Sequence, residues 1–210
     1  MSLPLMSFNV NAQQSTHSNS NLQNQNTMSV LWLQTSGEAK ALYHQGYNIG
    51  KMRLDEILKK KAKNNSKKIA VILDLDETVL DNSPYSAWMV STGNKYTQPT
   101  WLQWVNKANA KALPGAVEFL TYANTKGVDI YYISNRTEEE KTATIKNLQR
   151  IGAPQANSTH VLLKKKGEHG KETRRQEVTK THRIALLFGD NLADFSGFDD
   201  LSVTERIQAV

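Results

Sequence analysis

Four short apolar segments form the clearest pattern in this sequence. They cover residues 69–73, 128–133, 160–163 and 184–188, and charged or turn-forming residues flank them. The first, 69–73, is apolar throughout, and largely apolar runs of this length are typical of strands that are buried on both faces, as in a parallel sheet. Segments with helical spacing lie between them, so the chain is predicted to alternate strands and helices around one parallel sheet, an α/β fold.

The helical pattern is clearest in two places. From residue 30 to about residue 63, apolar residues recur mostly at helical spacing, with interruptions at Gly46 and Gly50, which predicts one or two helices packed against the core. Further along, Thr137 and Glu140 have the spacing of a capping box, which predicts the start of the helix after the second strand.

The N-terminal residues differ in composition from the rest. Residues 13–27 are almost wholly polar and lack an apolar period, so residues 1–29 are predicted to be a disordered linker or a signal remnant. Val10, Asn11 and Ala12 have the small-residue spacing of a signal-peptidase site. We therefore expect an exported protein, periplasmic, secreted or at the cell surface. A cytoplasmic protein is the alternative if the N-terminus is as written.

The composition of the chain limits the kinds of site and partner that the protein can have. Residues 30–210 have the length of one domain. The absence of cysteine excludes disulfides, thiolate zinc sites and cysteine nucleophiles, so any metal must be held by oxygen. The formal charge of +6 favours an anionic partner, while the short lysine runs are typical of solvated surfaces. Phosphate esters and nucleic acid are both anionic partners of this kind, but no nucleic-acid-binding module is recognisable, so we expect no nucleic-acid polymer as partner, and no transmembrane segment.

Carboxylates follow the first and the last predicted strand. Because residues of an extended chain alternate between two sides, Asp74 and Asp76 should face the same side, and such a pair needs either a proton or a cation between its members. Asp190 and Asp194 follow Gly189 after the last strand. Open α/β sheets bind ligands at the carboxyl ends of their strands, so both groups are placed for chemistry.

The segment from Asp74 to Tyr85, DLDETVLDNSPY, resembles the first motif of the haloacid dehalogenase (HAD) superfamily. More narrowly, it is similar to the class C acid phosphatases, the lipoprotein e family of phosphatases and 5'-nucleotidases. The resemblance implies a Rossmann-like, three-layer fold with a parallel central sheet and a small cap. Family members continue past the position of Val210, so we expect a C-terminally shortened chain, either a truncated product or a divergent member.

The resemblance also implies catalytic roles. Asp74 would be the nucleophile and Asp76 the general acid and base, and a Mg²⁺ ion would be held by Asp74, Asp76 and Asp190. Oxygen ligands with retained waters are what Mg²⁺ requires.

Phosphate-binding residues are expected after the second strand and in the basic segment before the last one. By resemblance, Ser134 and Asn135 match the second superfamily motif, and Lys171 supplies the cation that neutralises the transferring group. Lys165 and Lys166 are the competing lysines.

Further residues are expected to support these motifs. They are Thr78, Asn191 and Asp194, of which Asp194 would act through Asn191 or a bound water. Arg136 could serve at the edge of the pocket, although a surface salt bridge is favoured.

Residues 83–113 are rich in aromatic side chains and lack a long apolar period, which predicts a cap insertion over the substrate. By resemblance, Tyr96 and Trp101 stack against a nucleotide base. The alternative is that the rings form a small core of the cap itself, although Trp101 is favoured as a substrate contact.

Together these residues predict a Mg²⁺-dependent acid phosphatase. It would hydrolyse phosphomonoesters, nucleoside monophosphates among them, through an aspartyl-phosphate intermediate. Two alternatives stay open: a phosphotransferase, and a catalytically silent nucleotide-binding surface protein. A homodimer is a further expectation.

Overall fold

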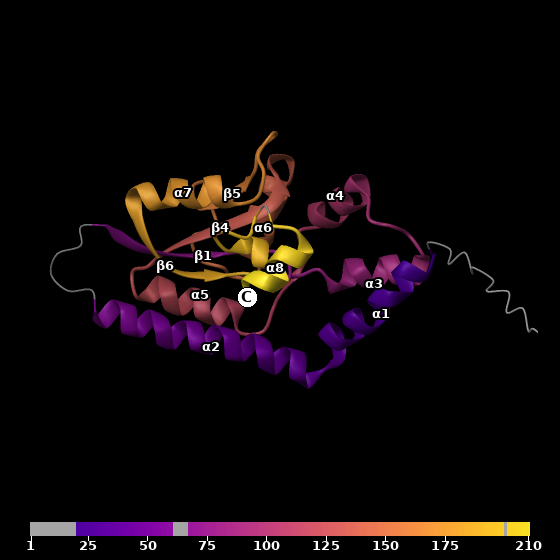
Figure 1. Cartoon of the computed structure of the whole chain (residues 1–210), viewed down its shortest axis with the longest axis horizontal. Coiled ribbons are helices and arrows are strands. Elements are labelled where there is room, and N and C mark those ends of the chain that lie inside the picture. Colours follow the sequence, from indigo (N-terminus) through magenta and orange to yellow (C-terminus); the bar gives the residue numbers. More distant parts are fainter. Residues whose placement is uncertain (1–19, 61–66, 200) are drawn as a thin grey trace, which may run out of the picture.

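The computed structural model describes residues 20–60, 67–199 and 201–210, and a four-stranded parallel sheet lies at its centre (Figure 1). In spatial order the strands are β5 (Val161–Lys164), β4 (Asp129–Thr137), β1 (Lys68–Leu73) and β6 (His182–Phe188). Ile69 to Leu73 of β1 are all buried, as expected for a central parallel strand. The predicted fold class is confirmed.

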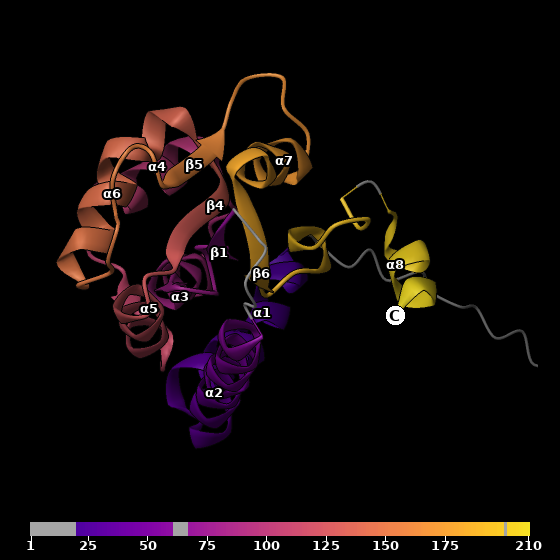
Figure 2. The same ribbon diagram turned by 90° about the vertical axis from the view of Figure 1, so that its left-hand side faces the viewer.

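Helices cover both faces of this sheet (Figure 2). Val71 and Leu73 of β1 face the larger core, whereas Ile72 faces a smaller one that includes Val178. The larger core is covered by α2 (Gly37–Lys59), α5 (Ala116–Thr125) and α6 (Lys141–Arg150), and the smaller one by α7 (Glu172–Thr181). This alternation follows from the period of two along a strand.

Helix α2 runs unbroken through Gly46 and Gly50, so the two glycines interrupt the apolar pattern but not the helix. Gly50 serves packing: a Cβ atom at this position would lie 2.3 Å from the ring Cζ of Phe188. The glycine lets α2 approach the end of β6, near the candidate site.

The linker prediction is also corrected in part, because helix α1 (Ser20–Thr35) begins within the segment 1–29. Residues 1–19 lie outside the described part of the chain. Helix α1 lies beside α3 (Ser83–Thr92), and Gln34 Nε2 donates to Ser83 Oγ over 3.1 Å (Figure 1). This packing, which local composition does not reveal, accounts for the helix. None of the described helices is both long and apolar enough to cross a membrane.

The aromatic segment forms a small helical unit beyond the carboxyl ends of the strands (Figure 1). It contains α3 and α4 (Gln98–Asn106). The chain enters and leaves this unit through two short antiparallel strands, β2 (Leu80–Asp81) and β3 (Lys111–Ala112). The predicted insertion at 83–113 corresponds to these helices and β3.

The remaining elements are short. The capping box of Thr137 and Glu140 is confirmed and begins the 3-10 helix η1 (Glu138–Glu140). A second 3-10 helix, η2 (Leu192–Asp194), follows β6, and α8 (Val203–Ala209) comes last.

Candidate active site

Asp74 lies where β1 ends, beside the end of β6. Its backbone N–H donates to the carbonyl of Phe188 over 2.9 Å, which fixes it next to the loop that carries Asp190 and Asp194. One carboxylate oxygen from each of the three aspartates lies within 4.8 Å of the others. The sheet thus brings two distant segments of the sequence into one acidic group.

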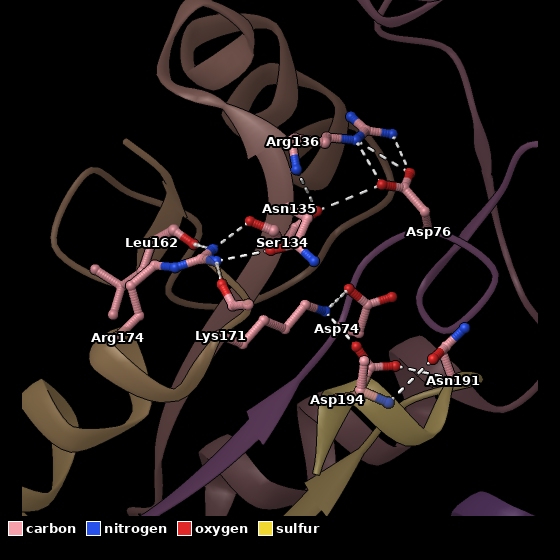
Figure 3. A network of polar contacts seen from close by, with 12 residues as sticks. Asp74, Asp76, Ser134, Asn135, Arg136, Leu162, Lys171, Arg174, Asn191 and Asp194 are labelled. Carbon is pink, nitrogen blue, oxygen red and sulfur yellow. Dashed lines mark hydrogen bonds and ion pairs between the residues drawn. The ribbon is translucent and has the colours of Figure 1, made fainter. Parts of the chain in front are cut away.

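Lys171, the N-cap residue of α7, extends into this group (Figure 3). Its Nζ contacts Asp74 Oδ1 and lies 2.6 Å from Asp194 Oδ1, and the residue is only 4% exposed. An ammonium between two buried carboxylates offsets their mutual repulsion. Lys165 and Lys166 are exposed and lie outside the cavity, so of the three candidate lysines the structure places Lys171 at the site.

The charge state of Asp74 depends on this environment. Burial is the main reason why the pKa of Asp74 is raised to about 7; Lys171 acts to lower it, and Asp194 and Asp76 act to raise it. Positive charge at the acidic group therefore favours the carboxylate form that a nucleophile requires.

The loop after β6 is shaped by side-chain caps. Asn191 N–H donates to Asp194 Oδ2 over 3.0 Å, and Asn191 Oδ1 accepts from the N–H of Ala193 over 3.0 Å. These reciprocal bonds form a capping box that begins η2. At Gly189, a Cβ atom would lie 2.3 Å from the Asp194 side chain, so only glycine lets the loop fold back this closely.

Asp76 differs from its predicted place in a metal site. Its carboxylate turns away from the acidic group, where Asp194 lies instead, and pairs with Arg136 from β4 (Figure 3). Arg136 Nη2 lies 2.7 Å from Asp76 Oδ1, and Asn82 Nδ2 donates to the same oxygen over 2.8 Å. Two strong donors on one side account for the orientation.

Arg136 is buried, with 4% exposure, and lines the cavity, so its position matches the pocket-edge alternative and the favoured surface salt bridge is wrong. Arginine is mostly exposed in proteins, which is why the surface role was favoured from the sequence. A signal was nevertheless present: Arg136 lies two residues after Ser134 in a predicted strand and loop, so both side chains should face the same side.

Ser134 and Asn135 line the same cavity as Asp74. Ser134 Oγ accepts from the backbone N–H of Arg136 over 3.1 Å and lies 3.4 Å from Asp76 Oδ2. Asn135 Oδ1 accepts from Arg174 Nη2 over 2.8 Å, and Arg174 also donates to the carbonyl of Ser134. Arg174 thus fixes the last part of β4 from outside the cavity.

Two tyrosines of α2 hold the loop after Asp76. The hydroxyl of Tyr43 donates to the carbonyl of Glu77 over 2.8 Å, and that of Tyr47 donates to the carbonyl of Thr78 over 2.7 Å. Glu77 has a φ of 59°, a conformation that is uncommon for residues other than glycine. The Thr78 side chain is buried and faces α2 rather than the cavity.

The cavity has a volume of about 540 Å³ and an aromatic wall. Tyr96 and Trp101 from the cap line it, with the ring centre of Trp101 5.5 Å from the Arg136 guanidinium. Tyr85 is buried and packs against Trp101, which shows that a small aromatic core also exists in the cap. The rings thus line the cavity and also form a small core of the cap, and stacking on a base stays a prediction.

The donor set suits a hard divalent cation. Acidic residues outnumber basic residues in the cavity wall. The acidic residues are Asp74, Asp76, Glu77, Glu140, Asp190 and Asp194, and the basic ones are Arg136, Lys171 and Arg206. Ionised carboxylates in this wall repel an anionic substrate, and a bound cation would offset that repulsion. Asp190 is the exposed member of the acidic group, so its oxygen is open to the cavity. Clustered carboxylate oxygens are the ligands that Mg²⁺ and similar ions prefer.

A parallel sheet with an acidic group at the ends of β1 and β6, and a small insertion after β1, defines an α/β domain of the haloacid dehalogenase class. Residues 2–209 match the family model described as HAD superfamily, subfamily IIIB (Acid phosphatase), and the chain belongs to this family.

Two solved structures are similar to this chain over most of its length. The class C acid phosphatase from Bacillus anthracis with tungstate bound is 57% identical and superposes with a TM-score of 0.86, covering 90% of this chain and 78% of that chain. A further structure of the Bacillus anthracis class C acid phosphatase, also 57% identical with the same coverage, gives a TM-score of 0.85. The predicted relationship is thereby confirmed.

Curated relatives are more distant. The stem 28 kDa glycoprotein of Glycine max is 27% identical over 136 residues, and acid phosphatase 1 of Solanum lycopersicum is 26% identical over 133 residues. The alignments cover 60% of this chain and 52% and 51% of those proteins. The chain therefore spans about half the length of the curated relatives that it matches.

Proposed function

We propose that the protein is a phosphoric monoester hydrolase, an acid phosphatase that requires Mg²⁺ and uses Asp74 as its nucleophile. The observation that carries this proposal is the acidic group of Asp74, Asp190 and Asp194 with the Lys171 ammonium inside it. Family membership and the similar acid phosphatases support the same reaction class.

In the proposed reaction, a carboxylate oxygen of Asp74 forms a bond to phosphorus while the bond to the ester oxygen breaks. Asp76 gives its proton to the departing oxygen and later takes a proton from the water that hydrolyses the aspartyl-phosphate, which frees Asp74 and inorganic phosphate. Lys171, Ser134 and Asn135 bind the phosphoryl oxygens. When bound by Asp74, Asp190 and Asp194, Mg²⁺ supplies positive charge that offsets the charge of the carboxylates and the phosphoryl group.

The aromatic wall supports nucleoside monophosphates as substrates. Tyr96 is 56% exposed at the cavity, and Trp101 lies beside it with 6.2 Å between the ring centres. Stacking of a base on such rings is worth about 1–3 kcal/mol and tolerates every base. Export and a homodimer stay predictions.

The test is phosphate release from nucleoside 5'-monophosphates, with Mg²⁺ and with a chelator, for the natural protein and for Asp74→Asn. We expect turnover that depends on the metal and is abolished in Asp74→Asn. Near-normal activity of this variant would contradict the mechanism. Stabilisation by nucleotide without any phosphate release would favour the silent binding protein instead.

A further inference from the structure

The two carboxylate oxygens of Asp76 have unequal surroundings (Figure 3). Oδ1 accepts from Arg136 Nη2 over 2.7 Å, from Arg136 Nε over 3.1 Å and from Asn82 Nδ2 over 2.8 Å. Oδ2 has only longer contacts, to Arg136 Nε at 3.2 Å and to Ser134 Oγ at 3.4 Å. Oδ1 is therefore saturated with donors, while Oδ2 is weakly held and faces Ser134.

The guanidinium of Arg136 is itself held by hydrogen bonds to neighbouring side chains. Its Nη1 donates to Thr144 Oγ1 over 3.0 Å, while Nε and Nη2 are bound to Asp76. The ring of Trp101 covers the guanidinium, and the residue is 4% exposed. Every nitrogen of the guanidinium thus has a protein partner. Arg136 is therefore not an unpaired cation available to bind an anionic ligand.

The side-chain amide of Asn82 is also held in one orientation by hydrogen bonds. Trp104 Nε1 donates to Asn82 Oδ1 over 2.8 Å, so the amide nitrogen of Asn82 is turned toward Asp76. Asn82 is 2% exposed, and its position is set by the strand pair that leads into the cap.

We propose that Arg136, assisted by Asn82, is a positioning residue: it holds Oδ1 of Asp76 so that Oδ2 carries the proton of the reaction. The inference rests on the proposed function and deepens it. In the first step, the Oδ2–H bond of Asp76 breaks as the departing oxygen gains the proton, while the new bond to phosphorus forms at Asp74. Arg136 stays bound to Oδ1 throughout and makes no contact with the phosphoryl group.

This role predicts a dependence on the leaving group. A nucleoside leaves as a basic alkoxide and needs the proton from Asp76, whereas p-nitrophenolate is a stabilised anion that departs without one. The ratio kcat/KM reports the steps up to phosphoryl transfer, and so excludes the later hydrolysis of the intermediate. A residue that orients the acid should therefore affect the two substrates unequally, and a residue that binds the phosphoryl group should affect them equally.

The experiment measures kcat/KM of Arg136→Gln and Arg136→Lys with a nucleoside 5'-monophosphate and with p-nitrophenyl phosphate. Since general acids contribute about 10²–10⁴-fold, we expect a loss of about 10-fold or more with the nucleotide beyond the loss with the aryl ester. The ratio of the two substrates does not depend on the fraction of folded enzyme. Arg136→Lys keeps the charge and most of the volume, and Arg150→Gln makes the same change as Arg136→Gln at an exposed position.

Asp76→Asn provides the reference for complete loss of the acid. Its substrate ratio should shift at least as far as that of Arg136→Gln, and the double variant should shift no further, because both changes remove one function. Equal losses on both substrates, or additive shifts in the double variant, would overturn the positioning role. An inactive natural protein or an active Asp74→Asn would instead contradict the proposed function, so the two failures are distinguishable.

Discussion

Tyr47, in the middle of α2, donates its buried hydroxyl to the carbonyl of Thr78 over 2.7 Å. One helical turn earlier, Tyr43 makes the matching bond to Glu77, whose backbone has a positive φ. A helix outside the catalytic motifs thus fixes the loop that carries Asp76.

Tyr47→Phe tests this support. The change leaves a buried carbonyl without its partner, which costs about 1–3 kcal/mol, so we expect a free energy of unfolding lower by that amount in urea denaturation. Tyr43→Phe is the matched control: its hydroxyl is less buried, and water can replace the bond, so the loss should be smaller. Equal stability of Tyr47→Phe and the natural protein would contradict the assigned role.

Lys171→Gln should expose the repulsion within the acidic group. Without the ammonium, Asp74 and Asp194 face each other at a buried site, and breaking such a pairing costs about 3–5 kcal/mol. We expect a lower melting temperature in chelator that Mg²⁺ partly restores, together with a large loss of activity. Lys166→Gln, at an exposed position, should change neither quantity.

Mg²⁺ should stabilise the folded protein through Asp190. A ligand at 100 times its Kd adds about 2.7 kcal/mol to the free energy of unfolding, which calorimetry or a thermal shift detects without any substrate. Asp190→Asn should remove most of this gain, whereas Glu139→Gln, an exposed acidic position in η1, should retain it. A full thermal shift in Asp190→Asn would exclude this residue from the metal site.

Stability of the metal-free protein should fall as the pH rises from about 4.5 to 7. Burial, followed by the charge of Asp76, raises the pKa of Glu77 from 4.5 to about 7. The folded state then holds a proton that the unfolded chain has lost, so the stabilisation is present at the acid end of this window and disappears as the pH passes the higher pKa. The pKa of Asp74 is also raised, so this group too makes the folded protein less stable as the pH rises.

Glu77→Gln should reduce that slope, because glutamine does not titrate. The measurement is the melting temperature at pH 5 and pH 7.5 in chelator, for both proteins. An unchanged slope in the variant would show that Glu77 does not contribute.

Trp101→Leu should weaken the binding of nucleotides. Loss of one stacking contact is worth about 1–3 kcal/mol, so we expect KM for a nucleoside monophosphate to rise roughly 10-fold. Glycerol phosphate, which has no base, should show little change in KM. Trp88→Leu is the control, because Trp88 packs on Tyr85 outside the cavity. Equal increases for both substrates would argue against stacking.

Sequence reasoning was reliable wherever a local pattern determines position. The apolar runs before Asp74 and Asp190 predict buried parallel strands, and the ends of such strands meet at one edge, so the encounter of these two aspartates was predictable. The choice of Lys171 over its neighbours came from the motif that it matches.

What the sequence does not contain is the direction of side chains in irregular segments. The carboxylate of Asp76 lies outside the acidic group because Arg136 holds it, whereas the capping box with Asn191 places Asp194 within the group. Gly50 reads as a helix breaker in isolation, and only contact with Phe188 explains it as a packing residue.

The strand pair β2–β3 is the only covalent route between the cap and the sheet within the described chain, since the insertion both begins and ends there. The aromatic wall that would select a substrate and the acidic group that would react with it consequently come from different segments of the chain. Exchange of residues 83–110 for the corresponding segment of a relative would test whether this insertion sets substrate preference, if Trp101 and Trp104 are kept for their contacts with Arg136 and Asn82.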